Sequence, residues 1–503
     1  MHNSLKILID DPANLESQEK KIISKPPLKG KDLVFLAIIK NIPVGYLVYN
    51  ITNKKIKSIF IKPSFRHMHI AKKLLHTLLF MYPLAKPLDH PFFYVMGYKR
   101  INKSYKIDFT IFDLKINPYI VKYKNYFYNL YNGSILELVN EDLSKKKPNL
   151  FNFCFYVPLQ TDFEAVFRYQ LKQKKSQGSN LITIITTELC NLNCPYCFEN
   201  TKDRTIITDK GKFLAVWKKI KPKIKNNFRL NFFGGEPFLN DSAIFWFTKK
   251  LRQYCEKRKY NYSLGVITNG TIFKKKYSNF FKRNEFEHIQ ITLDGDKTKH
   301  NKTRGQFNKI IENSHKFLSK AKTFGIRINV TKYNVESVMP LLKSLSREYN
   351  AKEKKKIFIS VGFVYNENTK NFAPRKQYTS LISNIIELNC FGFKFLKDPK
   401  FRVPICPASL HDNAWIDLNC RAYFCEHQIG NPFWKFENFK LFLPPKCVSC
   451  TYFPVCGGQC WASEKTKEPL WRNCILIKAG VKDYVKKVYN QNKNKKKGVF
   501  KTW

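Results

Sequence analysis

Several absences limit what this chain of 503 residues can be. It has no uninterrupted run of about 18 apolar residues, so it has no ordinary transmembrane helix and we expect no membrane partner. Its first residues lack the basic flank and apolar stretch of a secretory signal, so we expect a cytoplasmic protein. The hydrophobic fraction of 44% is ordinary and excludes global disorder. A chain of this length predicts about two to four domains.

Acidic residues and arginine are both scarce. The 89 Lys and Arg residues outnumber 38 Asp and Glu residues, which gives a net charge of +51, yet only 15 of the cations are Arg. A nucleic-acid partner is one interpretation of this charge. Readers of nucleic acid usually depend on Arg, however, and here Lys is spread along the whole chain. AT-rich codon usage therefore explains the charge better, and a nucleic-acid partner is not expected.

The chain contains 14 cysteines, and most of them are clustered. Without a secretory signal the thiols should stay reduced, and clustered reduced thiols are typical of metal ligands. One group occupies residues 190–197 and a larger one occupies residues 406–474. Three remaining cysteines are expected to be small buried side chains: Cys154, Cys255 and Cys390.

The hydrophobic patterns predict an α/β protein of several parts. Residues 181–390 alternate strands with helices about six times, which predicts a partial (β/α)6 barrel of the TIM type with its chemistry at the carboxyl ends of the strands. Within it we expect a helix at 307–323, a strand at 327–330 and a helix at 335–349. The predicted domains are a small α+β region at 1–100, a pre-barrel segment at 101–180, the barrel at 181–400, a cysteine-rich extension at 401–490 and a basic tail at 491–503.

Cys190, Cys194 and Cys197 follow the first barrel strand with the spacing C-x3-C-x2-C. Three thiolates on one loop can hold three corners of a four-iron cluster and leave one iron open to a ligand. The alternative is a zinc knuckle, which needs a fourth ligand such as His288 or His300.

The cysteine loop and three later strand ends together resemble the radical S-adenosylmethionine (radical SAM) superfamily. The resemblance implies a [4Fe-4S] cluster that binds SAM. It also implies that the segment Gly-Gly-Glu-Pro at residues 234–237, called here the GGEP-like segment, binds the amino group of the methionine part of SAM, and that Arg304 lies near its carboxylate. The residues that it implies for binding this cofactor are Gly234, Gly235, Glu236, Pro237, Thr268, Asn269, Thr292, Asp294 and Arg304.

The second cysteine group is similar to the SPASM extension of radical SAM enzymes that modify peptides. Where that pattern has a glycine, this chain has Cys420, which is a possible fourth ligand for an auxiliary cluster that is otherwise one ligand short. Zinc ribbons are the alternative. The resemblance implies two auxiliary clusters, one held by Cys406, Cys425 and Cys460 and the other by Cys447, Cys450, Cys456 and Cys474. Either Cys420 completes the first cluster, or its fourth iron is open and binds substrate. Glu426 follows Cys425 and, by the same resemblance, is a catalytic base; a surface glutamate is the alternative.

The N-terminal region resembles an acyl-CoA-binding loop of the GNAT acetyltransferases over residues 30–85, with His69 in place of a glycine. Acetyl-CoA is therefore a possible ligand, and a degenerate module is the alternative. Residues 105–178 resemble the segment that precedes the barrel in peptide-maturing SPASM enzymes and often recognises a leader peptide.

These patterns together predict a radical SAM oxidoreductase that abstracts hydrogen from a precursor peptide or protein and forms a thioether or carbon–carbon crosslink. The implied electron donor is a flavodoxin or ferredoxin. The alternatives are a formylglycine-forming sulfatase maturase and a zinc-stapled nucleic-acid-binding protein.

Overall fold

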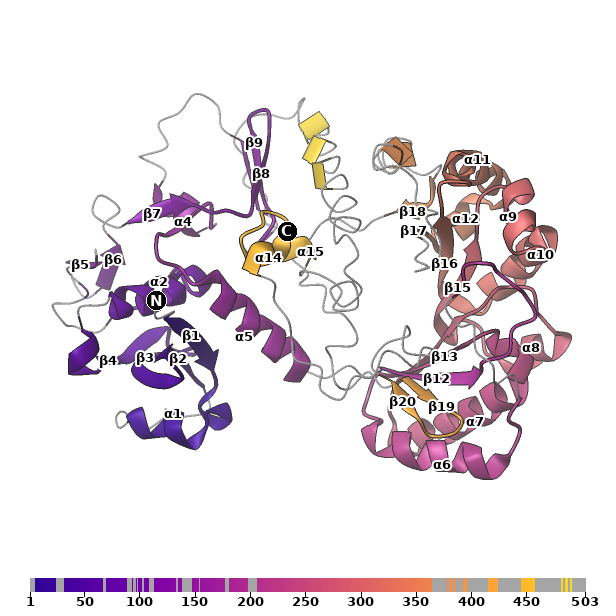
Figure 1. Cartoon of the computed structure of the whole chain (residues 1–503), viewed down its shortest axis with the longest axis horizontal. Coiled ribbons are helices and arrows are strands. Elements are labelled where there is room, and N and C mark those ends of the chain that lie inside the picture. The colour runs from indigo at the N-terminus through magenta and orange to yellow at the C-terminus, as the bar shows by residue number, and fades with distance from the viewer. Residues whose placement is uncertain are drawn as a thin grey trace.

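The computed structural model describes residues 5–23, 31–66, 69–87, 98–101, 104–107, 113–132, 134–137, 147–152, 154–176, 181–197, 206–363, 392–395, 415–423 and 445–456, with isolated residues elsewhere. Figure 1 shows two main bodies within these residues: an N-terminal antiparallel region and a larger parallel sheet with helices.

The N-terminal body is a four-stranded antiparallel sheet of order β1-β2-β3-β4. Lys40 and Asn41 both have positive φ and form the tight turn between β2 and β3. The helix that begins at Ile70 covers one face, because its leucines recur at helical spacing and are fully buried. The elements are β1 Lys6–Asp10, α1 Ser17–Ile22, β2 Asp32–Ile39, β3 Ile42–Asn50, β4 Lys55–Ile61 and α2 Ile70–Met81.

His69, which replaces the glycine of the acetyltransferase pattern, precedes α2 with a φ of 52°. The position therefore has the left-handed backbone that a glycine adopts without cost, and a histidine tolerates it at some expense. The strand, turn and helix start predicted for residues 59–75 are confirmed, while acetyl-CoA binding stays a prediction.

The pre-barrel segment forms short strands and one long helix. The strands after Tyr119, at Tyr126 and after Asn132 pair as the sheet β10-β9-β8. The elements are β5 Tyr98–Ile101, β6 Ser104–Ile107, β7 Leu114–Ile116, β8 Ile120–Tyr123, β9 Tyr126–Asn129, β10 Ile135–Glu137, α4 Lys147–Asn152, β11 Tyr156–Pro158 and α5 Phe163–Ser176.

The second body contains a nine-stranded sheet of order β18-β17-β16-β15-β14-β13-β12-β19-β20, and all its neighbours except β19 and β20 pair in parallel. The predicted alternation of strands and helices is therefore confirmed. The elements are β12 Leu181–Thr187, α6 Lys210–Ile220, β13 Phe228–Gly234, α7 Asp241–Arg258, β14 Tyr262–Ile267, α8 Lys275–Phe280, β15 Phe286–Leu293, α9 Lys297–Thr303, α10 Phe307–Leu318, β16 Ala321–Val330, α11 Val338–Glu348, α12 Ala351–Lys354, β17 Ile357–Phe363 and β18 Lys394–Phe395.

Three predicted bounds in this body differ from the structure. The helix expected at 307–323 ends at Leu318, and β16 begins at Ala321 rather than at Arg327. Gly325 lies inside this central strand, where an added Cβ would meet the His288 ring at 2.8 Å. The glycine thus reflects close packing between neighbouring strands rather than a break. The helix expected at 335–349 begins as a 3-10 turn, and its α-helical part starts at Val338.

The first part of the predicted cysteine-rich extension belongs to the parallel sheet. β19 Trp415–Asp417 pairs in parallel with β12, and β20 Ala422–Tyr423 turns back beside it. A further part, with α14 Pro445–Val448 and α15 Phe453–Cys456, packs instead on the pre-barrel segment near β8 and β9 (Figure 1).

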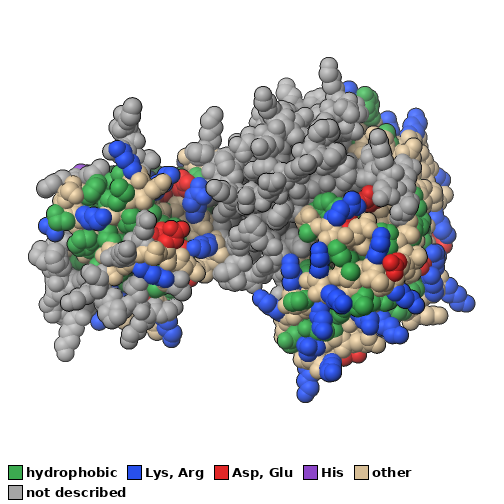
Figure 2. Space-filling model, turned by 60° about the horizontal axis from the view of Figure 1, so that its bottom comes forward, with side chains coloured by type: hydrophobic (Ala, Val, Ile, Leu, Met, Phe, Trp, Pro, Cys, Tyr) green, Lys and Arg blue, Asp and Glu red, His purple; other side chains and the backbone are tan. Residues whose placement is uncertain are grey.

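The cationic side chains are dispersed over the surface, as the lysines are along the sequence. On the face in Figure 2, Lys and Arg side chains are scattered over the parallel-sheet body. No helix among the described residues is long and apolar enough to cross a membrane.

Candidate functional site

The loop that carries Cys190 is fixed against the end of β13 by backbone contacts. Gly235 N–H donates to the carbonyl of Thr187 at 3.0 Å, and Glu236 N–H donates to that of Leu189 at 2.8 Å. A Cβ on Gly234, where φ is 135°, would lie 2.0 Å from the Thr187 oxygen, and one on Gly235 would lie 2.5 Å from that of Glu188. These two glycines therefore allow the GGEP-like segment to support the cysteine loop.

The Glu236 side chain connects the end of β13 to the end of β14. Its side chain is fully buried and accepts hydrogen bonds from Phe238 N at 3.0 Å, Thr268 Oγ1 at 2.8 Å and Asn269 N at 2.7 Å. Burial raises the pKa of Glu236 to about 7, against the lowering effect of these donors. Because these three donors already occupy the carboxylate, residues 234–237 would have to bind a ligand through their backbone atoms. Pro237 is buried beside it at the start of a 3-10 turn.

Asn269 connects the third strand end to the first cysteine. Its amide donates to Asn191 Oδ1 at 2.9 Å and lies 3.7 Å from Cys190 Sγ, which also accepts from Leu192 N at 3.4 Å. Asn191 in turn donates to Thr271 Oγ1 at 2.9 Å. Burial raises the pKa of the Cys190 thiol, and the two amide donors oppose that effect because they favour the thiolate.

A second network holds the other end of the loop. Tyr196, next to Cys197, donates its hydroxyl to Asp294 Oδ2 and accepts from Arg304 Nη1 at 3.0 Å. Thr303 Oγ1 donates to the same Asp294 oxygen at 2.8 Å. Arg304 and Asp294 are 3.9 Å apart at their nearest atoms and are both largely buried. Thr292 lies buried just before them at the end of β15.

Two polar atoms of this network lack a hydrogen-bond partner among the described residues: Asp294 Oδ1 and Arg304 Nε. Burial works to lower the pKa of Arg304, but Tyr196 and Asp294 outweigh it and keep the guanidinium charged. A ligand that carries an amine and a carboxylate could supply hydrogen bonds to both of these buried atoms, the amine to Asp294 Oδ1 and the carboxylate to Arg304 Nε.

The two histidines considered as a fourth ligand of the cysteine loop have other roles. His300 is fully buried, accepts from Asp294 N at 3.2 Å and donates to the Gly305 carbonyl at 3.0 Å. Burial lowers its pKa to about 4, so it is neutral at pH 7 and stabilises the turn that carries Arg304. His288 contacts Thr323 on the neighbouring strand.

The cysteines themselves are only partly assembled. Cys190 and Cys194 are half-buried and Cys197 is exposed. No group of three or more His, Cys, Asp or Glu side chains in the described part of the chain converges on a common point. The donor set still fits a four-iron cluster, since three thiols share one loop with amide donors at Cys190 and unpartnered polar atoms beside it.

In the second cysteine group, Cys447 and Cys450 lie on one turn, with Cys450 N–H donating to the Cys447 carbonyl at 2.9 Å. The Tyr119 hydroxyl donates to the Val448 carbonyl at 2.7 Å, and the turn packs on an aromatic cluster that includes Phe167 and Phe453. Cys456 ends α15. The remaining predicted residues lie outside the described residues: Cys406, Cys425, Glu426, Cys460 and Cys474, as does Cys390.

Cys420 occupies the turn between β19 and β20 with a φ of 63°, the backbone that the glycine of the SPASM pattern would supply. Its N–H donates to the Asp417 carbonyl at 3.0 Å, and its side chain packs against the apolar core of the parallel sheet. A role as cluster ligand stays a prediction. Cys154 and Cys255 are buried, as expected.

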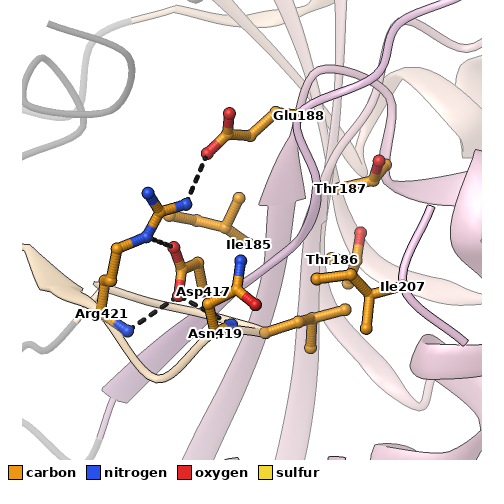
Figure 3. Close-up of a pocket in the computed structure, with 9 residues that line it drawn as sticks. Ile185, Thr186, Thr187, Glu188, Ile207, Asp417, Asn419 and Arg421 are labelled. Carbon is orange, nitrogen blue, oxygen red and sulfur yellow. Dashed lines mark hydrogen bonds and ion pairs between the residues drawn. The ribbon is translucent and has the colours of Figure 1, made fainter. Parts of the chain in front are cut away.

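The turn between β19 and β20 also contacts the first cysteine loop, and no sequence motif indicated this contact. Arg421 lies between Asp417 on β19 and Glu188, which comes two residues before Cys190 (Figure 3). These residues line a small pocket that has room for about one water molecule. In the sequence, only the position of Arg421 next to Cys420 hinted at this contact. The pairing of β19 with β12, which brings Arg421 beside Glu188, could not be read from the sequence.

Residues 184–349 match the model of the Radical SAM superfamily, so this part of the chain is a radical SAM domain. The chain is 26% identical to the radical SAM cyclopropyl synthase TigE of Paramaledivibacter caminithermalis, over 36% of this chain and 40% of that protein. It is 33% identical to a cysteine-type anaerobic sulfatase-maturating enzyme of Clostridium novyi, over 25% of this chain and 36% of that protein.

The matches therefore span about two-fifths of the length of these curated relatives. Among solved structures, native anSMEcpe with bound AdoMet is 20% identical, with a TM-score of 0.47, over 62% of this chain and 100% of that one.

Proposed function

We propose that this protein is a radical SAM enzyme that modifies a peptide or protein substrate. The observation that carries the proposal is the set of contacts by which three strand ends hold the Cys190 loop, within the region that matches the radical SAM model. A four-iron cluster with bound SAM would supply reductive cleavage of SAM and a radical that abstracts hydrogen from the substrate.

The chain's own residues would bind and orient that cofactor. Cys190, Cys194 and Cys197 would hold the cluster, and Asn269 would hydrogen-bond to the Cys190 sulfur. Asp294 and Arg304, each with an unpartnered buried atom, would bind the charged end of SAM. Tyr196 would keep both in place, because its hydroxyl contacts each of them.

Peptide modification is the substrate class that the relatives favour. The C. novyi relative is named for maturation of a sulfatase, and the SPASM-like cysteine spacing of residues 447–474 is the pattern of peptide-modifying enzymes. The products that we favour are a thioether or carbon–carbon crosslink.

Formylglycine formation on a sulfatase is the second candidate, favoured by the 33% identity to the maturating enzyme. A sulfatase-derived cysteine peptide separates the two candidates by mass spectrometry: conversion of its cysteine to an aldehyde would favour the second.

The proposal is tested by SAM cleavage under anaerobic conditions with dithionite. The reconstituted protein should release 5′-deoxyadenosine, and Cys194→Ala should abolish the release while Cys255→Ala, a buried cysteine away from the site, should not. Wild-type protein that contains the cluster and releases none would overturn the proposal.

A further inference from the structure

Arg327 lies on the face of the parallel sheet that points away from the helices. Its neighbours along β16, Ile326 and Ile328, are fully buried in the apolar core between the sheet and the helices, and successive side chains of a strand point to opposite faces. Arg327 and Asn329 therefore project from the other face. There Asn329 Nδ2 donates to the Tyr196 hydroxyl at 3.4 Å, so this end of β16 lies next to the cysteine loop.

A glycine on the neighbouring strand makes room for the Arg327 side chain. β17 pairs with β16 in parallel, and an added Cβ on Gly362 would lie 2.5 to 2.7 Å from three atoms of the guanidinium. The guanidinium therefore rests on the backbone of β17, and its Nε donates to Asn329 Oδ1 at 3.0 Å. Ser360, the partner of Arg327 across the two strands, is exposed, so solvent reaches this part of the face.

Most of the hydrogen-bonding capacity of this guanidinium is not used within the described part of the chain. A guanidinium carries five N–H donors, and only the donor on Nε has an acceptor among the described residues. No ion pair joins Arg327 to a carboxylate among them, unlike Arg304, which pairs with Asp294. The four remaining donors have the forked geometry that binds a carboxylate through two parallel hydrogen bonds.

We propose that Arg327 binds a carboxylate of the peptide substrate and so selects peptides that carry an acidic side chain or a free C-terminus near the residue to be modified. The carboxylate would lie at the carboxyl ends of β16 and β17, on the same face as the cysteine loop. The inference rests on the proposed function, because it names a chemical feature of the substrate.

Affinity selection read by mass spectrometry tests this on the reconstituted full chain with SAM. The probe is an equimolar pool of short peptides with random flanks, acetylated and amidated, that carry glutamate or glutamine at the centre. Wild-type protein should retain glutamate peptides over glutamine peptides. Arg327→Gln should lower that ratio about tenfold, which one charge-assisted hydrogen bond supplies. Glutamine peptides with a free C-terminal carboxylate, added as a third set, show which carboxylate is bound.

Arg229→Gln is the matched control. Arg229 alternates with the buried Phe228 and Leu230, so it lies on the same face of the sheet, but near the amino end of β13. This variant removes the same charge and should leave the ratio unchanged. Gly362→Ala keeps every charge, but its Cβ would displace the guanidinium, so it should also lower the ratio. Circular dichroism confirms that each variant is folded.

The proposal is overturned if wild-type protein shows no preference for a carboxylate, or if the preference persists in Arg327→Gln. An equal loss in Arg229→Gln would also overturn it, because attraction to the general positive charge would then explain the preference. So would a weaker affinity of Arg327→Gln for SAM in equilibrium dialysis without peptide, since the guanidinium would then bind the cofactor. The selection needs no reductant and no turnover, so its failure is distinguishable from a failure of SAM cleavage.

Discussion

The Cys190 loop and the Cys447–Cys450 turn are held by different kinds of contact. The Cys190 loop is fixed by backbone hydrogen bonds and by a buried carboxylate at the carboxyl ends of parallel strands. The Cys447–Cys450 turn is held by aromatic packing and by the Tyr119 hydroxyl. The geometry of the Cys190 loop is therefore set by residues at the ends of the neighbouring strands, such as Glu236. The geometry of the Cys447–Cys450 turn instead depends on its packing against the pre-barrel segment.

The largest effect should come from Glu236→Ala. It leaves three buried donors without their acceptor, at about 1 to 3 kcal/mol each, so we expect a loss of about 3 kcal/mol or more in the free energy of unfolding. The Cys190 loop should also lose its support. Chemical denaturation and iron content measure the two effects.

Glu285→Ala is the matched control for that variant. Glu285 is also buried, accepts from Arg252 and Tyr262, and lies just before β15 at the opposite end of the sheet. Removing it should cost about 3 to 5 kcal/mol, because Arg252 loses its partner. Once folded, this variant should keep its iron. Equal iron loss in both would show that instability alone releases the cluster.

Gly235→Ala should have the next largest effect. Its Cβ would meet backbone oxygens at 2.5 Å, so the cysteine loop must shift, at about 1 to 3 kcal/mol. Gly305→Ala is the comparison, because an added Cβ there meets nothing within 4 Å and only the φ of 80° costs about 1 kcal/mol. SAM cleavage per iron should fall only in the first variant; a fall in both would argue against the loop support.

Tyr119→Phe tests the second turn. It removes one buried hydrogen bond to the Val448 carbonyl, at about 1 to 2 kcal/mol, and should reduce iron bound by the C-terminal cysteines while sparing that of the first loop. Tyr131→Phe also removes one hydrogen bond, from Gln170, in the same aromatic cluster. Mössbauer spectra that show the same cluster loss in both variants would contradict the comparison.

The smallest effect should be a dependence of stability on pH that neither turn causes. Burial works to lower the pKa of His315, but hydrogen bonds to Glu353 at 3.0 Å and Glu348 at 3.1 Å outweigh it, and the pKa is raised. The stabilisation that protonated His315 adds to the folded state is therefore complete below the unfolded pKa of about 6.5. It is lost as the pH rises through the higher pKa of the folded state.

His315→Gln should flatten the thermal stability profile in that pH range. His288→Gln should not, because burial lowers the pKa of His288 from 6.5, so any effect of its titration on stability lies below that pH. An unchanged profile in His315→Gln would show that other groups set the pH dependence.

Much of the first site could be predicted from the sequence, because each motif follows a strand with a clear apolar pattern. Gly235, Asn269, Asp294 and Arg304 lie where parallel strand ends bring them together. The start of β16 was missed because Gly325 and the polar residues before it resemble a helix end.

The contacts between distant parts of the chain could not be predicted in this way. Tyr119 and Val448 are 329 residues apart, and Arg421 and Glu188 are 233 apart, so no local pattern connects them. Likewise, the short strand Trp415–Asp417 carries too little periodicity to show that it joins the parallel sheet. Such contacts depend on the packing of whole elements rather than on propensity.

The most direct test of the account is the iron, sulfide and zinc content per chain after anaerobic purification and reconstitution. We expect about twelve iron atoms, as three four-iron clusters require, and about four fewer in the variant Cys190→Ala/Cys194→Ala/Cys197→Ala. Zinc without iron in the wild-type protein, or an unchanged iron content in the triple variant, would contradict the assignment of the Cys190 loop.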